Sequence, residues 1–438
     1  MCEFCSDTLF VFSKKEQIQL AKDLKIGDVV GDAINQLHEG GKVDKATKKA
    51  LWAGHNAPLQ KAVVEGYGKP LSKIEYGTPN YEFLKQLQTN TAVFAMFKSH
   101  ASMKDMAALL KDADGNLRSK YDFKKEALKV DDTYRTTKLD VEYDTAVRQA
   151  RMASQWAKFQ KNKHLYPNLK YLLTKAAKPD EKHLQFVGII RPVDDAFWNA
   201  HYPPNRWRCQ CSVEQTDEDA GDIPDNIPPV PAEFAFNSGK TGQIFDIEKC
   251  NYYNVVSPKE QVSLIKKAKD YMNTDIAAQL PYQTLYASNN GATVDVHPLT
   301  FNEPDLNNLI RNARSLANIG KNIKMLPAVK DVTLRAALLP KDIVKNIRTP
   351  DFVIDGKMNA DLKVMAGTSK RTLKHQFDDL KGQTNNLLIE AADDFPFTKY
   401  QTIKMVKEKM RQKEMKGFGE VWINYKGNWI FNPHKKRD

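Results

Sequence analysis

Cysteine, long apolar runs and a basic segment near the start are scarce or missing in this sequence of 438 residues. Five cysteines are too few for a disulfide-rich scaffold, which favours a protein that folds in a reducing compartment. No stretch approaches the roughly 18 to 20 apolar residues of a membrane-spanning helix. The opening segment MCEFCSDTLFVFSKKEQ has no basic region before its short apolar patch, so we expect no cleaved secretion signal.

The composition is that of a globular protein with an excess of positive charge. Hydrophobic residues make up 41% and charged residues 27% of the chain, and 66 Lys and Arg outnumber 54 Asp and Glu. Residues 292–438 hold 26 of these basic residues and 17 of the acidic ones, and residues 399–437 hold 11 and 3. A basic face of this kind attracts polyanions, above all nucleic acid, although a solvated lysine-rich helix would look the same.

The length predicts about three domains, at roughly 150 residues each. Changes in residue composition and apolar periodicity along the chain indicate where these domains lie. Residues 1–220 form the first domain, in which the first 160 residues or so are mostly helical in pattern and residues 166–211 form a small irregular region rich in aromatic and turn residues. Residues 221–292 form a proline-rich connector and a mixed region. Residues 293–438 form the last domain, and the whole is predicted to be an α+β multidomain protein.

The last domain shows alternating helix and strand signals. Apolar spacing predicts a helix over residues 303–316 with Gly320 as its C-cap. Asp355-Gly356 and Lys426-Gly427 stand between strand-like segments and predict two hairpins. Together with a buried strand at 386–390 and a basic helix at 400–413, they predict a curved antiparallel sheet with interleaved helices.

Two cysteines of the irregular region are spaced to bind one ion. Cys209-x-Cys211 brings two thiols within reach of a single metal, and either His183 or His201 could complete a structural zinc site. The alternative is that both cysteines are small hydrophobic residues packed beside tryptophan.

The same region resembles the Mu F-like phage head-morphogenesis (minor head protein) family over residues 50–215. The matching residues include Asp180, Glu181 and His183, then Asp195, and then the run from Tyr202 to Cys211, in which Arg206 replaces the usual glycine. The resemblance implies a protein of the bacterial cytoplasm and the phage virion, located in the head interior or at the portal vertex. Its partners would be phage portal and capsid proteins.

A second group of candidate site residues, charged and polar, lies between residues 349 and 391. Asp361 and Lys363 are two apart on a predicted strand, so their side chains share a face, and Asp351 precedes the same hairpin. A carboxylate beside an amine suits phosphodiester cleavage, because the lysine stabilises developing charge and the carboxylate moves a proton or holds a metal. Hydroxyl, amide and guanidinium groups follow at Ser369, Arg371, Thr372, Gln376, Asn385 and Asn386.

Residues 305–433 resemble the tRNA-cleaving toxin domains of contact-dependent growth-inhibition proteins, within the barnase–EndoU–colicin–RelE-like group. The resemblance implies an endoribonuclease that needs no cofactor, acts on RNA such as tRNA and is blocked by an immunity protein. It implies catalytic roles for Asp361, Lys363, Thr372 and Asp351. Ser369, Arg371, Gln376, Asn385 and Asn386 would bind the substrate.

Two alternatives stay open for this domain. Pro350-Asp351 followed by Asp361-x-Lys363 also fits a metal-dependent DNA nuclease, in which the two aspartates hold Mg²⁺ and the lysine positions the attacking water. The other alternative is non-enzymatic: a basic tail on a head protein that binds nucleic acid without cutting it.

Overall fold

The computed structural model describes residues 26–174, 181–330, 332–345, 348–365, 384–391, 395–412, 415 and 418–435. It divides the chain into two compact units, Met1–Met272 and Asn273–Asp438. The expected bounds at 220/221 and 292/293 differ from this division. Residues after 221 pack on the first unit, because the Asn90 side chain accepts hydrogen bonds from the backbone N–H groups of Ile244 and Phe245 at 2.9 Å. The sheet of the second unit begins before residue 293.

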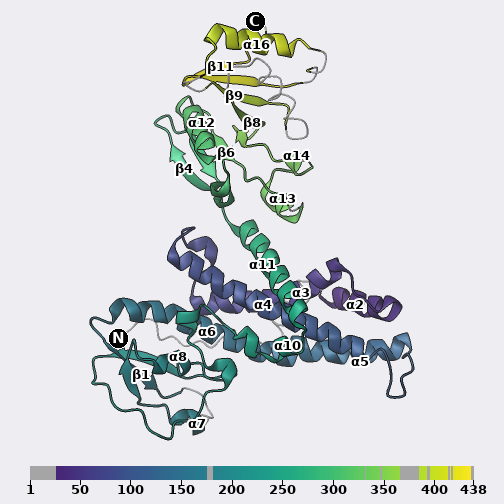
Figure 1. The fold of residues 1–438 in the computed structure, drawn as a ribbon, viewed down its shortest axis with the longest axis vertical. Coiled ribbons are helices and arrows are strands. Elements are labelled where there is room, and N and C mark those ends of the chain that lie inside the picture. The colour runs from purple at the N-terminus through teal and green to yellow at the C-terminus, as the bar shows by residue number, and fades with distance from the viewer. Residues whose placement is uncertain are drawn as a thin grey trace. The chain divides into compact units, whose positions relative to one another are not determined.

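The first unit is built mainly from long helices (Figure 1). Helix α3 begins after Asp44, whose side chain accepts a hydrogen bond from the Thr47 N–H, and ends at Gly68 in the left-handed region. Helix α4 begins after Thr78, with Pro79 in its first turn. The main helices and helical turns are α2 (Ile26–Gly40), α3 (Lys45–Tyr67), η1 (Leu71–Lys73), α4 (Pro79–Ala108), α5 (Lys120–Thr133), the π-helical turn η2 (Tyr134–Lys138) and α6 (Leu139–Asn162).

A buried ion pair joins two of these helices. Lys98 of α4 and Glu142 of α6 are in direct contact, and both side chains are almost completely buried. The Tyr252 hydroxyl also donates to the Glu142 carboxylate, at 2.8 Å. Because an unpaired charge at this depth would be costly, the pair fixes how α4, α6 and the later segment meet.

The irregular region of the first unit is a small antiparallel sheet surrounded by short elements. The strand order is β2-β1-β3, with Leu169 of β1 paired to Arg191 and Gln215. Its elements and those that follow are β1 (Asn168–Leu172), α7 (Glu181–Leu184), β2 (Ile190–Pro192), α8 (Phe197–Ala200), β3 (Ser212–Thr216), η3 (Ala232–Phe234), α9 (Ser238–Thr241), η4 (Ile247–Lys249), α10 (Asn251–Asn254) and α11 (Pro258–Gln279).

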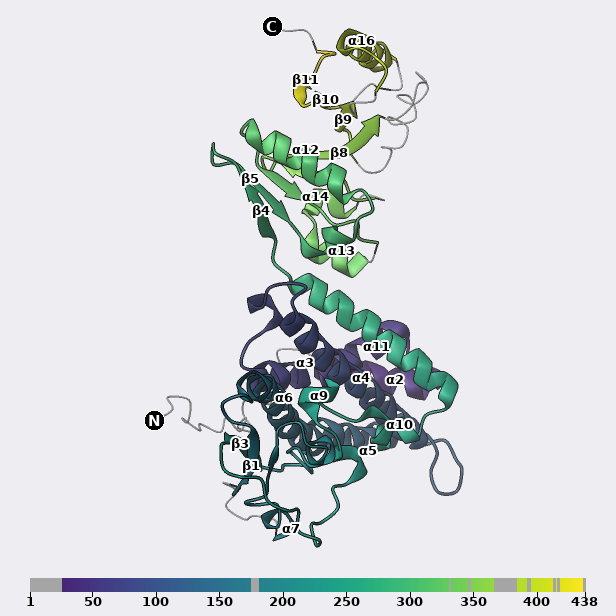
Figure 2. The same ribbon diagram turned by 60° about the vertical axis from the view of Figure 1, so that its left-hand side comes forward.

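The second unit contains an eight-stranded sheet in the order β11-β10-β9-β8-β7-β6-β5-β4 (Figure 2). The α+β class is confirmed, and the sheet is mixed: β4/β5, β6/β7, β7/β8 and β10/β11 are antiparallel as expected, whereas the other three pairs are not. The pairs β5/β6, β8/β9 and β9/β10 are parallel. Parallel neighbours need a crossover connection, which η5 and α12 provide between β5 and β6 and α16 provides between β9 and β10. The elements are β4 (Gln283–Ala287), β5 (Thr293–Val296), η5 (Pro298–Asn302), α12 (Leu306–Asn318), β6 (Ile323–Met325), α13 (Val332–Leu338), α14 (Lys341–Val344), β7 (Phe352–Ile354), β8 (Met358–Met365), β9 (Leu387–Ala391), α16 (Lys399–Met410), β10 (Val421–Tyr425) and β11 (Asn428–Phe431).

The two long helices of this unit cover opposite faces of the sheet. On β9, Leu388 packs in the core under α12, whereas Leu387 and Ile389 pack in the core under α16. On β8 the same alternation places Leu362 towards α12 and Met365 towards α16. Asp361 and Lys363 share the parity of Met365 and therefore lie on the α16 face.

Several local predictions are confirmed. The hairpins form at Asp355-Gly356 and Lys426-Gly427, and all four of these residues have positive φ. Lys426-Gly427 is a two-residue loop between Tyr425 and Asn428, whereas the first loop also includes Lys357, because Ile354 pairs with Met358. The helix expected at 303–316 is α12, and Gly320 follows it with φ +89°. In the described part of the chain, no helix is long and apolar enough to cross a membrane.

Candidate functional site

Strand register brings the two predicted catalytic aspartates together. β7 and β8 are antiparallel, with Phe352 paired to Ala360. Continuing that register by one residue places Asp351 opposite Asp361, as a directly facing cross-strand pair. The Asp361 side chain is buried, and Asp351 is partly exposed.

Asp351 is held in place by backbone groups on both sides. Its carboxylate accepts a hydrogen bond from the Leu362 N–H at 2.7 Å, and its carbonyl accepts one from the Leu326 N–H at 2.9 Å. Burial, together with the neighbouring Asp361 carboxylate, raises the pKa of Asp351 well above its ordinary value. Two acidic groups in contact cannot both carry full negative charge cheaply, so the pair favours a shared proton or a bound cation.

Lys363 completes the cluster. Its Nζ lies 2.7 Å from Asp361 Oδ2, and its side chain is 24% exposed whereas that of Asp361 is 2% exposed. The ammonium group therefore sits at the solvent side of a buried carboxylate. A reacting phosphate can approach such a group, and the carboxylates behind it can hold a cation.

One positioning residue was not singled out from the sequence. Arg335 of α13 is 5% exposed and donates hydrogen bonds to the carbonyls of Val329 and Ile343 and to the Thr349 hydroxyl. It thereby anchors the chain two residues before Asp351. Its only signal in the sequence is an arginine inside the apolar segment TLRAALL.

The side-chain amide of Asn386 links neighbouring segments of the sheet by hydrogen bonds. Its Nδ2 donates to the Asn359 carbonyl at 2.7 Å, and its Oδ1 accepts from the Glu420 N–H at 2.8 Å. Its own carbonyl accepts from the Asp361 N–H at 3.2 Å. Both ends of the amide therefore join the starts of β8 and β10 next to the cluster, whereas Asn385 is exposed. The other predicted site residues lie outside the described residues: Ser369, Arg371, Thr372 and Gln376.

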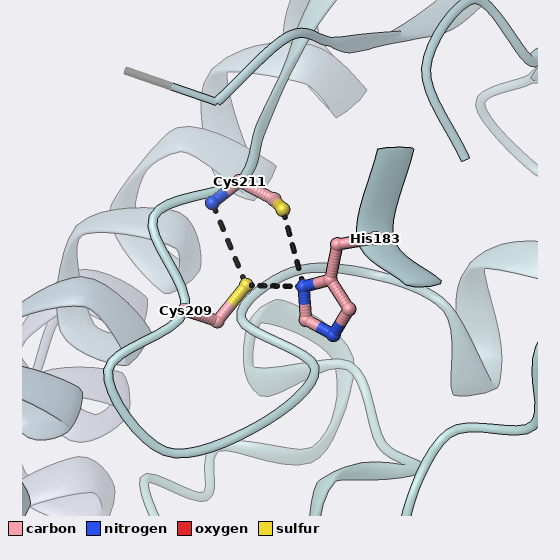
Figure 3. Close-up of side chains that lie close together, drawn as sticks. All are labelled: His183, Cys209 and Cys211. Carbon is pink, nitrogen blue, oxygen red and sulfur yellow. Dashed lines mark hydrogen bonds between the residues drawn. The ribbon is translucent and has the colours of Figure 1, made fainter. Parts of the chain in front are cut away.

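The first unit holds a separate cluster of metal-binding side chains (Figure 3). The Nδ1 atom of His183 lies 3.4 Å from both Cys209 Sγ and Cys211 Sγ, and all three donor atoms fall within 4.8 Å of one another. The three residues come from α7 and the segment before β3, and all are buried. Two ligands of a tetrahedral zinc ion stand about 3.6 Å apart, given zinc bonds of about 2.0 and 2.3 Å.

The surroundings of this cluster favour a thiolate. The hydrogen bond from Cys211 lowers the pKa of Cys209 to about 4, and His183 acts in the same direction. The same hydrogen bond between the two thiols raises the pKa of Cys211, and burial acts in the same direction. The thiolate is the form of cysteine that binds metal. His201, the alternative ligand, is not part of the cluster, because its ring stacks on Phe197 with a centroid separation of 4.4 Å.

Comparisons with known families match the two units separately. Residues 99–214 match the model of the Phage Mu protein F like protein family. Residues 348–429, which include Asp351, Asp361 and Lys363, match the Contact-dependent growth inhibition CdiA C-terminal domain. The chain therefore combines a region similar to Mu F-like proteins with a region similar to the CdiA C-terminal domain.

Curated relatives match the Mu F-like region. The chain is 32% identical over 71 residues to the putative capsid assembly protein F of Escherichia phage Mu, and 35% identical over 66 residues to the Mu-like prophage FluMu F protein of Haemophilus influenzae. These alignments cover 16% and 15% of this chain and 16% of each relative, so the chain spans about a sixth of the length of these relatives. No solved structure is significantly similar to the chain.

Proposed function

We propose that the CdiA C-terminal domain of this chain cleaves phosphodiester bonds of nucleic acid, with RNA as the substrate. The observation that carries the proposal is the contact of Asp351 with Asp361, beside the ammonium of Lys363. The basic excess of residues 292–438 supports a polyanionic substrate. RNA, and tRNA in particular, is proposed because the sequence resembles tRNA-cleaving toxin domains.

The pairing of the carboxylates favours the metal-assisted form of this chemistry over the cofactor-free form. Asp351 and Asp361 would hold Mg²⁺, a hard cation that prefers carboxylate oxygens. When bound, the ion supplies Lewis acidity at the phosphate. Lys363 would stabilise the negative charge that develops on the phosphate, and Arg335 would keep Asp351 in register through Thr349.

A cleavage assay with the full chain tests the proposal. Labelled tRNA and double-stranded DNA are incubated with the chain, with Mg²⁺ and in Mg²⁺-free buffer without a chelator, so that other bound metals stay in place. We expect Lys363→Ala to reduce RNA cleavage at least about 100-fold, the size typical for losing one electrostatic stabiliser. Lys357→Ala is the matched control, because Lys357 is exposed in the turn of the same hairpin.

Each outcome separates the alternatives. Cleavage of RNA that needs Mg²⁺ supports the proposal, and cleavage that continues unchanged without Mg²⁺ favours the cofactor-free ribonuclease. Cleavage of DNA in preference to RNA favours the DNA nuclease. Binding without cutting by the unchanged chain would leave only a nucleic-acid-binding tail.

For the first unit we propose a role in phage head assembly, with portal and capsid proteins as partners and the virion and bacterial cytoplasm as locations. The Mu F-like match over residues 99–214 supports this role. We also propose that His183, Cys209 and Cys211 hold a structural zinc ion. The role in head assembly is tested by mass spectrometry of purified phage particles, which should detect peptides of both units. Particles without peptides of either unit would contradict that role. An immunity protein is proposed as a further partner of the nuclease.

A further inference from the structure

One edge of the eight-stranded sheet is formed by β11, which has β10 as its only strand partner in the described part of the chain. Its sequence, Asn-Trp-Ile-Phe, contains no charged residue and no proline, and Asn428 and Phe431 are exposed. An edge of this kind is a template for pairing with another strand. The opposite edge is less regular, because the pairing of β4 with β5 shifts register between Thr284 and Tyr286.

Strand alternation directs part of the β11 backbone outwards. The N–H of Asn432, the residue after β11, donates to the Val421 carbonyl of β10 at 2.9 Å. Backbone groups of successive strand residues point to alternate sides, so Ile430 also directs its N–H and C=O to β10. Trp429 and Phe431 direct theirs away from β10, where an added strand would form hydrogen bonds with them.

A groove with a volume of about 480 Å³ borders this edge. It lies on the α16 face of the sheet, because Ile403 and Met410 of α16 and Ile430 of β11 line it and pack on one core. None of its described lining residues belongs to β10, so it lies towards the outer side of β11. A strand added beside β11 would run about 4.8 Å beyond it and direct every second side chain to the α16 face, into the groove. The described lining residues are Ile403, Lys407, Met410, Arg411, Ile430, Phe431, Asn432, Pro433, His434 and Lys435.

The groove is basic, and none of its described lining residues is a carboxylate. Lys407 and Arg411 are exposed and stand one helical turn apart, so both side chains lie on the same side of α16. Lys435 is paired with Glu420 at 2.6 Å. Acidic side chains on the added strand would therefore meet Lys407 and Arg411.

The other face of β11 favours an apolar side chain. Phe431 pairs with Trp422 on the α12 face, at a ring centroid separation of 4.8 Å, and is still 45% exposed. A neighbouring side chain of an added strand would cover this ring. Nucleic acid in the groove would use the cations but not the ring, which lies on the opposite face of the sheet. A second copy of this chain, paired edge to edge, would bring one basic groove against another.

We propose that the β11 edge binds an acidic polypeptide segment of a partner protein. This segment adds a strand to the sheet, with its carboxylates in the groove beside Lys407 and Arg411 and its apolar side chains beside Phe431. The interface goes beyond the proposed cleavage, and its test measures binding alone.

The test uses the full chain and a fluorescent peptide of about eight residues in which valine and glutamate alternate, so that each residue type faces one side of the sheet. Fluorescence anisotropy gives the dissociation constant. Two further peptides carry N-methyl groups, one on every valine and the other on every glutamate. Because alternate N–H groups of a strand point to opposite edges, only one of these peptides lacks the N–H groups that face β11, whichever way the strand runs.

We expect one methylated peptide to bind at least about 10-fold more weakly than the unmodified peptide and the other to bind within about twofold of it. Lys407→Ala/Arg411→Ala should weaken binding of the unmodified peptide about 10-fold. The matched control is Lys399→Ala/Lys404→Ala, which removes the same charge from exposed positions of the same helix that do not line the groove. Melting curves show whether each variant folds, and the methylated peptides test the edge without any change to the protein.

Four outcomes would overturn the proposal. Equal binding of the two methylated peptides would exclude strand pairing, and equal losses in the groove and control variants would attribute binding to general charge. An oligouridylate that binds more tightly than the peptide, with the same dependence on Lys407 and Arg411, would make the groove a nucleic-acid site. Dimerisation of the chain that the peptide disrupts would identify a second copy as the occupant. Absence of nuclease activity would contradict the proposed function and leave each of these comparisons unchanged.

Discussion

Asp351 and Asp361 face each other across the β7–β8 hairpin, and the Leu362 N–H donates to the Asp351 carboxylate at 2.7 Å. The two aspartates are ten residues apart in sequence, and the turn at Asp355-Gly356 sets their register. Any shift of this register by one residue would move Asp361 and Lys363 to the opposite face of the sheet. The geometry of the turn is therefore part of the geometry of the site.

Replacing Asp351 by asparagine should abolish cleavage and stabilise the protein when no divalent cation is bound. Because the folded-state pKa of Asp351 is raised above the ordinary 3.8, its protonated form favours folding. That contribution is complete below about pH 3.8 and is lost as pH rises through the raised pKa. The melting temperature of Asp351→Asn should therefore exceed that of the unchanged chain at pH 7 and approach it near pH 4.

Magnesium provides the control for this prediction. Mg²⁺ should raise the melting temperature of the unchanged chain at pH 7, since a ligand of the folded state stabilises it, and should have little effect on Asp351→Asn. Equal melting temperatures of the two proteins at every pH would show that the carboxylates do not repel each other as the structure indicates.

Replacing any residue of the His183–Cys209–Cys211 cluster should abolish zinc binding by the first unit. We expect the unchanged chain to retain zinc through dialysis and Cys209→Ala, Cys211→Ala and His183→Ala to lose it, as measured by mass spectrometry of the metal. The controls are His201→Ala and Cys250→Ala, which remove the same residue types from positions outside the cluster. The retained zinc should fall as pH is lowered, because the ligands must be deprotonated.

A melting experiment complements the zinc measurement. A chelator should lower the melting temperature of the first unit in the unchanged chain and leave that of Cys209→Ala where it is. Retention of zinc by all three cluster variants would place the metal elsewhere, and absence of zinc from the unchanged chain would contradict the site.

Asn386→Ala should destabilise the second unit by about 1–3 kcal/mol, because it leaves the Glu420 N–H without its partner and removes one of the two hydrogen bonds that the Asn359 carbonyl accepts. Asn385→Ala is the matched control and should change stability by less than about 0.5 kcal/mol, since Asn385 is exposed. Calorimetry of the full chain measures both. A stable Asn386→Ala variant whose KM for RNA is raised would instead support the role in substrate binding that the sequence indicates.

Gly66→Ala should disrupt the packing of α3 on α6. A Cβ atom at this position would lie 2.1 Å from the Val147 carbonyl oxygen, which belongs to the backbone and cannot move aside cheaply. We expect a loss of about 1–3 kcal/mol in the free energy of unfolding. Gly31→Ala in α2 is the control, because a Cβ there meets no atom within 4 Å, and it should gain up to about 1 kcal/mol. Similar denaturation midpoints for the two variants would refute the close approach.

Local sequence patterns determined the turns, the amphipathic helix and the side-chain faces of single strands in this protein. Asp355-Gly356 and Lys426-Gly427 predict hairpins because few residues tolerate positive φ, and apolar spacing predicts α12 because a helix brings every third and fourth residue to one face. The Asp361-x-Lys363 spacing places both side chains on one face of a strand without any knowledge of its neighbours.

Only the tertiary structure decided how distant segments meet. Helical and strand signals do not tell strand direction, so the parallel pairs of the sheet were not foreseen. Spacing cannot choose between His183 and His201, which lie 26 and 8 residues before Cys209; the packing of α7 puts His183 against the thiols and Phe197 covers His201. Burial and strand register are long-range properties, and these determine that Asp351 contacts Asp361.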